Sequence, residues 1–121
     1  MKLKVGQFIR TNDGYINKIE KVNQFNVLVD GRDLFGEKLN IPNNEITKAS
    51  YNIIDILEEG DYVNGQKNYY DEELDFLYVQ SFDADGEFYQ ESITKQSFID
   101  NIKSVITHEQ MEQMAYKVDD I

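Results

Sequence analysis

Carboxylates are the groups with which this chain would have to do chemistry, because it contains 23 Asp and Glu residues, one histidine and no cysteine. They cluster at Glu58–Glu59, Glu72–Glu73 and Asp83/Asp85. Two carboxyl groups about 5–9 Å apart are the catalytic pair of glycosidases. A glycosidase also needs an aromatic-lined cleft, which a small β-domain with short loops does not form. We therefore expect no glycosidase activity.

The segment "DADGE" (Asp83–Glu87) resembles the start of a calcium-binding EF-hand loop, with alternating carboxylates and a glycine. That loop requires glycine at position six and a bidentate glutamate at position twelve. Counted from Asp83, glycine falls at position four and position twelve is Thr94. The segment therefore predicts a hairpin turn with Asp at its tip.

Other catalytic and cofactor sites lack the residues they need. The single histidine, His108, lies in the first turn of a predicted helix, where the helix dipole disfavours a positive imidazolium. There is no Gly-x-Ser-x-Gly nucleophile motif, and metal sites built on imidazole and thiolate lack ligands. The glycines of "VDGRDLFG" lack the Lys-Ser/Thr of a phosphate loop. We expect no enzyme activity, no metal and no cofactor.

The elements that position these residues are predicted to be short strands joined by tight turns. Asx-Gly pairs favour hairpin turns because both central residues must tolerate a positive φ. Four such pairs follow or separate alternating apolar runs: Asp13-Gly14 between Gln7–Thr11 and Tyr15–Val22, Asp30-Gly31 after Phe25–Val29, Asn64-Gly65, and Asp85-Gly86 between Leu74–Phe82 and Glu87–Ile93.

One helix has local support, because Thr107 and Gln110 form a capping box with Glu109 in the first turn of "THEQMEQM". The following "AYKV" (115–118) is predicted to be a closing strand. "KQSFIDNIKSVI" and "EITKASYNIIDIL" fit a helical face, but their apolar residues also fit strands.

The strand predicted over Leu74–Phe82 alternates so that both of its faces are largely apolar. Leu74, Phe76, Tyr78, Gln80 and Phe82 share one face, while Asp75, Leu77, Val79 and Ser81 share the other. We therefore expect a central strand with carboxylates gathered at its two ends.

Lys4–Ile19 and Glu58–Tyr70 share a weak pattern of polar residues, glycine, an aromatic residue, a β-branched residue and a turn. The echo indicates either two small barrels or one barrel with a duplicated hairpin, although so short a match can also arise by chance. We expect a mainly β fold with minor α content: a small SH3-like barrel, or two packed β-subdomains, with one or two short helices. The expected parts are a β-subdomain at 1–50 and an acidic β-hairpin subdomain at 51–121, which can also form one continuous domain.

The net charge of −11 is unevenly distributed. Residues 1–50 carry a net +2 and residues 51–121 a net −13. Such a field attracts basic partners and repels nucleic acid and anionic membranes. No apolar run reaches the roughly 18 residues of a membrane span, the amino terminus has no signal-peptide core, and the absence of cysteine fits a reducing compartment. We therefore expect a cytoplasmic protein, in a host cell, that binds neither nucleic acid nor membrane.

Three segments together resemble a group of small uncharacterised phage and prophage proteins of Gram-positive bacteria: "KVGQFIRTNDGYINKI", "ITKASYNIIDILEEGDYVNG" and "IKSVITHEQMEQMAYKV". The resemblance covers most of the chain outside the acidic middle, Tyr69–Glu91, which departs from the group's pattern. It implies a β-rich fold and a phage accessory role but no catalytic residues. Small acidic phage proteins often block host nucleases or polymerases, and anti-CRISPR proteins that occupy the nucleic-acid channel of a Cas effector are one such class.

Two functions follow as hypotheses. The first is a non-enzymatic inhibitor that binds a basic nucleic-acid-handling host protein, such as a CRISPR-associated nuclease, through an acidic surface that mimics nucleic acid. Its predicted contact residues are Glu58, Glu59, Asp61, Tyr69, Tyr70, Asp71, Glu72, Glu73, Asp75, Asp83, Asp85, Glu87, Tyr89 and Glu91. The alternative is an SH3-like scaffold that binds a small ligand in an aromatic pocket of Phe8, Tyr15, Phe35 and Tyr62, or acts in phage replication or assembly, with its acidity serving solubility only.

Overall fold

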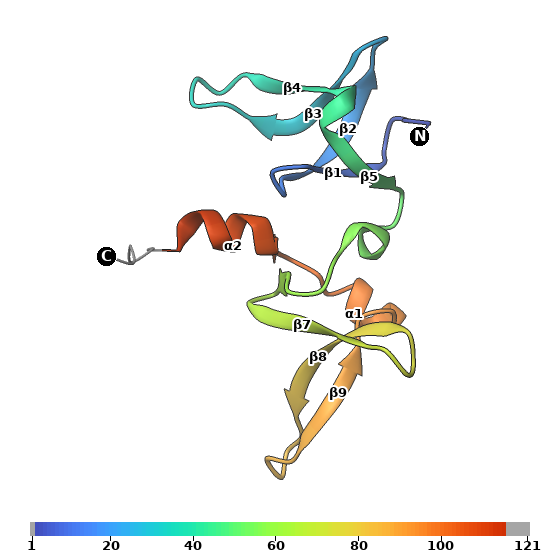
Figure 1. The fold of residues 1–121 in the computed structure, drawn as a ribbon, viewed down its shortest axis with the longest axis vertical. Coiled ribbons are helices and arrows are strands. Elements are labelled where there is room, and N and C mark those ends of the chain that lie inside the picture. Colours follow the sequence, from blue (N-terminus) through green and yellow to red (C-terminus); the bar gives the residue numbers. More distant parts are fainter. Residues whose placement is uncertain (1, 116–121) are drawn as a thin grey trace, which may run out of the picture. The chain divides into compact units, whose positions relative to one another are not determined.

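The computed structural model describes residues 2–115 and shows a mainly β protein. Its contacts divide it into two compact units, 1–56 and 57–121, which run from blue to green and from green to red in Figure 1. The first unit contains β1 (Phe8–Thr11), β2 (Ile16–Val22), β3 (Asn26–Arg32), β4 (Lys38–Pro42), the 3₁₀ helix η1 (Asn43–Glu45), β5 (Ile46–Ser50) and the 3₁₀ helix η2 (Ile53–Ile56). The boundary predicted after residue 50 therefore precedes η2, which belongs to the first unit.

The second unit contains β6 (Tyr62–Val63), β7 (Gln66–Asp71), β8 (Phe76–Phe82), β9 (Phe88–Ser92), α1 (Gln96–Ile99), β10 (Val105–Ile106) and α2 (His108–Met114). Each unit is built on one five-stranded antiparallel sheet, in the orders β4-β3-β2-β1-β5 and β10-β6-β7-β8-β9. The mainly β fold is thus confirmed. The pairings over the described residues do not close either sheet into a barrel, so the SH3-like barrel stays a prediction.

The first unit has an aliphatic core drawn from four of its five strands. Ile9, Ile19, Val27, Val29 and Ile46 are all less than 9% exposed, and Leu3, Leu39, Ile41 and Ala49 pack against them. On β3 the two fully buried residues, Val27 and Val29, are two positions apart and therefore lie on the same face of the sheet.

The first unit also contains a fully buried arginine on β1, Arg10. Arg10 Nη1 donates a hydrogen bond to the carbonyl of Ile56, 3.1 Å away. The contact ties β1 to the end of η2, so that the 3₁₀ helix is held to the sheet.

The two units are structural repeats of one another. In both sheets the first four strands of the unit lie next to one another in chain order. The fifth strand pairs with the free side of the first strand. Equivalent backbone hydrogen bonds fix the alignment: Gly6 N to Ile19 O and Ile19 N to Gln7 O correspond to Gly60 N to Asn68 O and Asn68 N to Asp61 O. Ile19 pairs with Val29 as Asn68 pairs with Val79. Lys4–Ile19 and Glu58–Tyr70, the two segments whose similar residue pattern suggested a duplication, thus lie at equivalent positions in the two units.

The turns after the third strand of each unit are also built alike. Asp33 N and Asp83 N both donate to a carbonyl four residues on, and Gly36 N and Gly86 N donate back to the Asp carbonyls. The Asp Oδ1 atom in each turn accepts two further backbone N–H groups. Both glycines have a φ near +80° (79° and 81°), a conformation that favours glycine. The hairpin turn predicted at Asp85-Gly86 is confirmed.

The hairpins predicted at Asp13-Gly14 and Asn64-Gly65 are confirmed by the pairings of β1 with β2 and of β6 with β7. The turn predicted at Asp30-Gly31 is wrong, because both residues lie inside β3 and the chain reverses at residues 33–37. A Cβ on Gly31 would come within 2.3 Å of the Asn17 side-chain oxygen. Gly31 is therefore explained by close packing at an irregular part of the β3–β4 pairing rather than by a turn.

The helix predicted after Thr107 is confirmed, including both halves of its capping box. The two ambiguous segments each form both structures: β5 is followed by η2, and α1 is followed by β10. The closing strand predicted at 115–118 falls almost entirely outside the described residues; Ala115 is the C-cap of α2. Within residues 2–115, no helix has the length and apolar character needed to span a membrane.

Candidate interaction surface

In the second unit, most aromatic residues of Tyr69–Glu91 lie on one face of the sheet, whereas most acidic residues lie in the turns at its ends. Directly opposed residues of an antiparallel pair lie on the same face of the sheet. Asn68, Val79 and Glu91 are opposed across β7, β8 and β9, and the first two are fully buried, so this face covers the unit's interior. β8 pairs with β7 on one side and with β9 on the other, so it is an interior strand as predicted, although β7 is the middle strand of the five.

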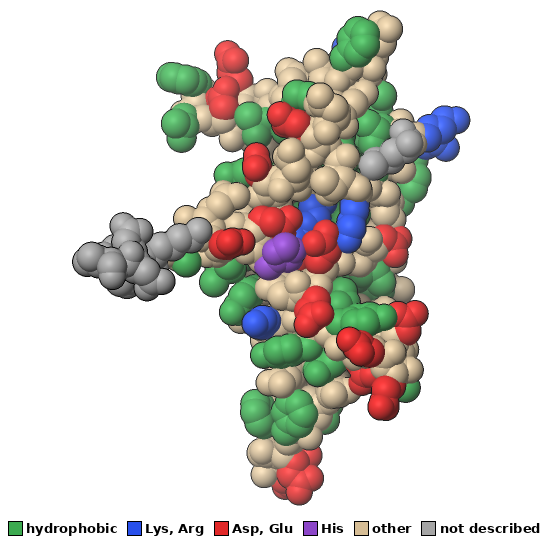
Figure 2. Space-filling model, in the orientation of Figure 1, with side chains coloured by type: hydrophobic (Ala, Val, Ile, Leu, Met, Phe, Trp, Pro, Cys, Tyr) green, Lys and Arg blue, Asp and Glu red, His purple; other side chains and the backbone are tan. Residues whose placement is uncertain are grey.

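The opposite face carries a row of aromatic side chains, which we call the aromatic face: Tyr69, Phe76, Tyr78, Phe82 and Phe88. Tyr69 stacks on Tyr78 with ring centroids 5.7 Å apart, and Phe76 meets Tyr78 edge to face at 6.1 Å. At the far end of β8, Phe82 and Phe88 also meet edge to face at 6.1 Å and remain 68% and 50% exposed. Apolar side chains open to solvent are visible over this unit in Figure 2.

The turn that joins β7 to β8, residues 72–75, carries the first group of carboxylates. Asp71 Oδ1 accepts the N–H groups of Glu73 and Leu74, both at 3.0 Å, and so shapes the turn. Asp75 has a φ of +54° and accepts a hydrogen bond from the Tyr70 hydroxyl. That hydrogen bond, followed by desolvation and by the negative charges of Asp75, Glu72 and Asp71, raises the pKa of Tyr70 above its ordinary value.

The turn that joins β8 to β9, residues 83–87, carries the second group. Asp83 is occupied in holding the turn, whereas the side chains of Asp85 and Glu87 are exposed. The two turns lie at opposite ends of β8, a strand of seven residues, so roughly 20 Å separates them. As predicted, the carboxylates gather at the two ends of the central strand.

The remaining predicted contact residues are dispersed. Asp61 is fully buried, and its two oxygens accept the N–H groups of Glu58 and His108, so it contributes nothing to a contact surface. Glu59 is exposed, and Glu58 lies beside His108. Tyr70, Tyr89 and Glu91 are on the same side of the sheet as Val79, although Tyr70 and Tyr89 are 41% and 44% exposed at its margins. Of the predicted tyrosines, only Tyr69 lies on the aromatic face.

Sequence reasoning missed Phe88, and it assigned Phe76, Tyr78 and Phe82 to one face without treating them as contact residues. The signal for Phe88 was present in "FDADGEF": a five-residue turn between two phenylalanines places them opposite one another. No group of three metal ligands lies on the aromatic face. Within residues 2–115, the one such group is Glu58, His108 and Glu109.

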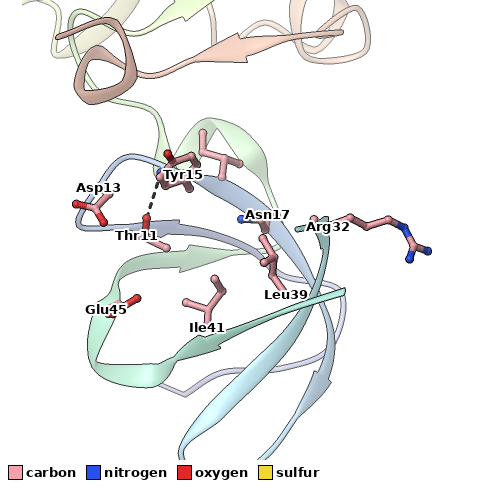
Figure 3. A pocket seen from close by; sticks show the side chains of 10 residues that line it. Thr11, Asp13, Tyr15, Asn17, Arg32, Leu39, Ile41 and Glu45 are labelled. Carbon is pink, nitrogen blue, oxygen red and sulfur yellow. Dashed lines mark hydrogen bonds between the residues drawn. The ribbon is translucent and has the colours of Figure 1, made fainter. Parts of the chain in front are cut away.

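A separate pocket of about 410 Å³ lies in the first unit (Figure 3). Leu39 and Ile41 line it with apolar groups, while Asp13 and Glu45 supply carboxylates. Tyr15 lines it as well, and the Tyr15 N–H donates to Thr11 Oγ1 at 3.1 Å. Figure 3 shows the Arg32 side chain extending away from the pocket.

The aromatic pocket predicted from Phe8, Tyr15, Phe35 and Tyr62 does not form as such. Of these four residues only Tyr15 lines the pocket in the first unit. Phe35 is 90% exposed at the tip of the β3–β4 turn, and Lys18 Nζ lies over the Phe8 ring at 5.5 Å from its centroid. Tyr62 belongs to the second unit.

Comparison with known proteins adds no relatives: no family model matches the chain, and no curated protein or solved structure is significantly similar to it.

Proposed function

We propose that this protein is a non-enzymatic binding protein whose second unit docks on a basic, nucleic-acid-handling protein and competes with the nucleic acid. The phage resemblance makes a host nuclease, such as a CRISPR-associated nuclease, the partner to test first. One observation carries the proposal: the aromatic face lies between two turns that bear carboxylates, at 72–75 and 83–87.

Such a surface suits arginine and lysine side chains in two ways. Carboxylates at the ends of the sheet attract the cations over a distance and pair with them on contact. Aromatic rings bind cations on their faces. The chain itself contains one such contact, in which Lys67 Nζ lies 5.6 Å from the centroid of the Tyr69 ring. Between Gln66 and Ser92 there are eight acidic residues and one basic residue, so nucleic acid itself is repelled.

The first test is charge reversal at positions that do not hold the fold. Asp71, Asp75 and Asp83 are unsuitable because they make turn or side-chain hydrogen bonds. Glu72→Lys/Glu73→Lys changes two exposed side chains in the turn that joins β7 to β8. The matched control is Glu37→Lys/Glu45→Lys in the first unit, which changes the net charge equally.

Binding to a panel of purified CRISPR nucleases and other basic nucleic-acid enzymes is measured by fluorescence anisotropy, with DNA as competitor. We expect Glu72→Lys/Glu73→Lys to weaken binding by at least about tenfold at 150 mM salt, where the Debye length is about 8 Å, and the control to change it by less than threefold. Equal loss in both variants, or in neither, contradicts the proposal.

A second candidate function is small-ligand binding by the first unit, which the pocket of about 410 Å³ favours. Its apolar wall and two carboxylates fit a small apolar molecule that carries an amine. In that case Glu72→Lys/Glu73→Lys leaves ligand binding unchanged. Ile41→Arg, which fills the pocket, abolishes ligand binding in a thermal-shift screen of small amines.

A further inference from the structure

Glu58, His108 and Glu109 form a cluster of metal-ligand type in the second unit. His108 Nε2 lies 2.9 Å from Glu58 Oε1 and 2.9 Å from Glu109 Oε1, and the three ligand atoms all lie within 4.8 Å of one another. We propose that this cluster binds one divalent first-row transition metal ion, with Zn²⁺ as its representative.

Two carboxylates converge here on a single nitrogen. An imidazole Nε2 carries at most one hydrogen, so the ring cannot give each carboxylate a full hydrogen bond of its own. A divalent cation placed between the three atoms can take the nitrogen and both oxygens as ligands at once. Imidazole nitrogen and carboxylate oxygen are both ordinary zinc ligands.

The dimensions fit such an ion after small side-chain rotations. Tetrahedral zinc with ligands at about 2.0–2.1 Å separates neighbouring ligand atoms by roughly 3.3 Å. The two nitrogen–oxygen distances of 2.9 Å are a few tenths of an ångström shorter than that. The His108 side chain is 40% exposed, which leaves room for water as a further ligand.

The fold holds the ligands in place through a buried group. The Asp61 carboxylate accepts the Glu58 N–H at 2.8 Å through one oxygen and the His108 N–H at 2.9 Å through the other. Asp61 therefore fixes the two backbones that carry ligands 50 residues apart in the chain. At Gly60, an added Cβ would approach the His108 Cβ to 3.3 Å, so the glycine lets the histidine backbone come close.

The first unit shows that the fold does not require this cluster. Gln7 accepts the Lys4 N–H through its side-chain oxygen, as Asp61 accepts the Glu58 N–H. Lys4 thus stands where the second unit has Glu58. The segment after β5, Tyr51–Asn52, offers neither imidazole nor carboxylate. The three ligands are therefore a property of the second unit alone, added to a framework that both units share.

The experiment uses the full chain with Zn²⁺ and with Co²⁺ as a spectroscopic substitute, at 150 mM salt and with excess Mg²⁺ to suppress diffuse binding to the acidic surface. His108 is the only histidine, so its ring NMR signals need no assignment. We expect equimolar Zn²⁺ to shift or broaden those signals, and Co²⁺ to give the visible absorption of a site with fewer than six ligands.

His108→Gln and Glu58→Gln should each weaken Zn²⁺ binding by at least about tenfold in calorimetry, and the matched control Glu72→Gln/Glu73→Gln should leave it unchanged. Circular dichroism verifies that the variants fold, and Glu109→Gln in the first turn of α2 gives a third variant if either of the others unfolds. Binding that is equal in the ligand variants, or His108 signals that ignore Zn²⁺, overturns the proposal. This test involves no protein partner, so its outcome is independent of the proposed function.

Discussion

The contact between Tyr70 and Asp75 couples a strand residue to a turn residue in a left-handed conformation. The hydrogen bond to Asp75 is the main reason that the pKa of Tyr70 is raised from 10.0. A raised pKa means that the folded chain holds the phenolic proton more tightly than the unfolded chain does. The contact therefore contributes stability below about pH 10, and that contribution is lost as the pH rises through the folded-state pKa.

Asp75→Gly should lower the pKa of Tyr70 toward its ordinary value, because it removes the hydrogen bond and the nearest charge while glycine tolerates the φ of +54°. Titration of the tyrosine Cζ signals by ¹³C NMR measures the change. Glu73→Gln serves as the control, because Glu73 is not among the causes of the shift. A Tyr70 that titrates together with exposed tyrosines in the unmodified protein would show that the contact is not made in solution.

The turns at 33–37 and 83–87 share one set of hydrogen bonds but carry different residues at their tips. Leu34 and Phe35 are 101% and 90% exposed, whereas their counterparts are Ala84 and Asp85. The Asp side chain and the glycine hold each turn, so the tip residues are free to vary.

Leu34→Ala/Phe35→Asp, which copies the second tip onto the first, should change the free energy of unfolding by less than about 0.5 kcal/mol. Asp33→Ala should cost about 1 kcal/mol, because Asp33 Oδ1 accepts two backbone N–H groups. Urea unfolding followed by circular dichroism measures both. If the tip variant is as destabilised as Asp33→Ala, Leu34 or Phe35 has a structural role that its exposure hides.

The sequence predicted elements well wherever a local rule determined them. The Asx-Gly pairs at Asn64-Gly65 and Asp85-Gly86 lie at chain reversals because their conformations are set by neighbouring residues. Asp30-Gly31 was misassigned because the reason for Gly31 is the side chain of Asn17, on another strand. The same limit explains why Glu58 and His108 could not be paired from the sequence: their contact depends on the buried carboxylate of Asp61.

At the scale of the whole molecule, the two units share a framework but differ in their interiors. Ile19 in the first core has Asn68 as its counterpart, and both are almost completely buried. Neither side-chain polar atom of Asn68 has a hydrogen-bond partner within residues 2–115. An unpaired buried amide costs about 1–3 kcal/mol, so the second unit is weakened relative to the first.

Asn68→Ile, which copies the first unit's residue, should stabilise the second unit by about 1–3 kcal/mol. Hydrogen exchange read by mass spectrometry should show slower exchange in β7 and β8 and no change in β1–β3. Ile19→Val is the control, because it trims the equivalent position in the other unit and should accelerate exchange only there. Faster exchange in β7 after Asn68→Ile would mean that the amide has a partner, such as a buried water, that the substitution removes.

The matching register of the two sheets makes the first unit a natural recipient for transplanted surface residues. Val29 and Val79 are equivalent, as are Asp33 and Asp83. Each outward-facing position of β8 therefore has an equivalent position on β3. Moving the phenylalanines and tyrosines of β8 to β3 would transfer the proposed docking surface to the first unit without redesigning a backbone. The first unit thus provides an equivalent backbone on which the proposed docking surface can be rebuilt one side chain at a time.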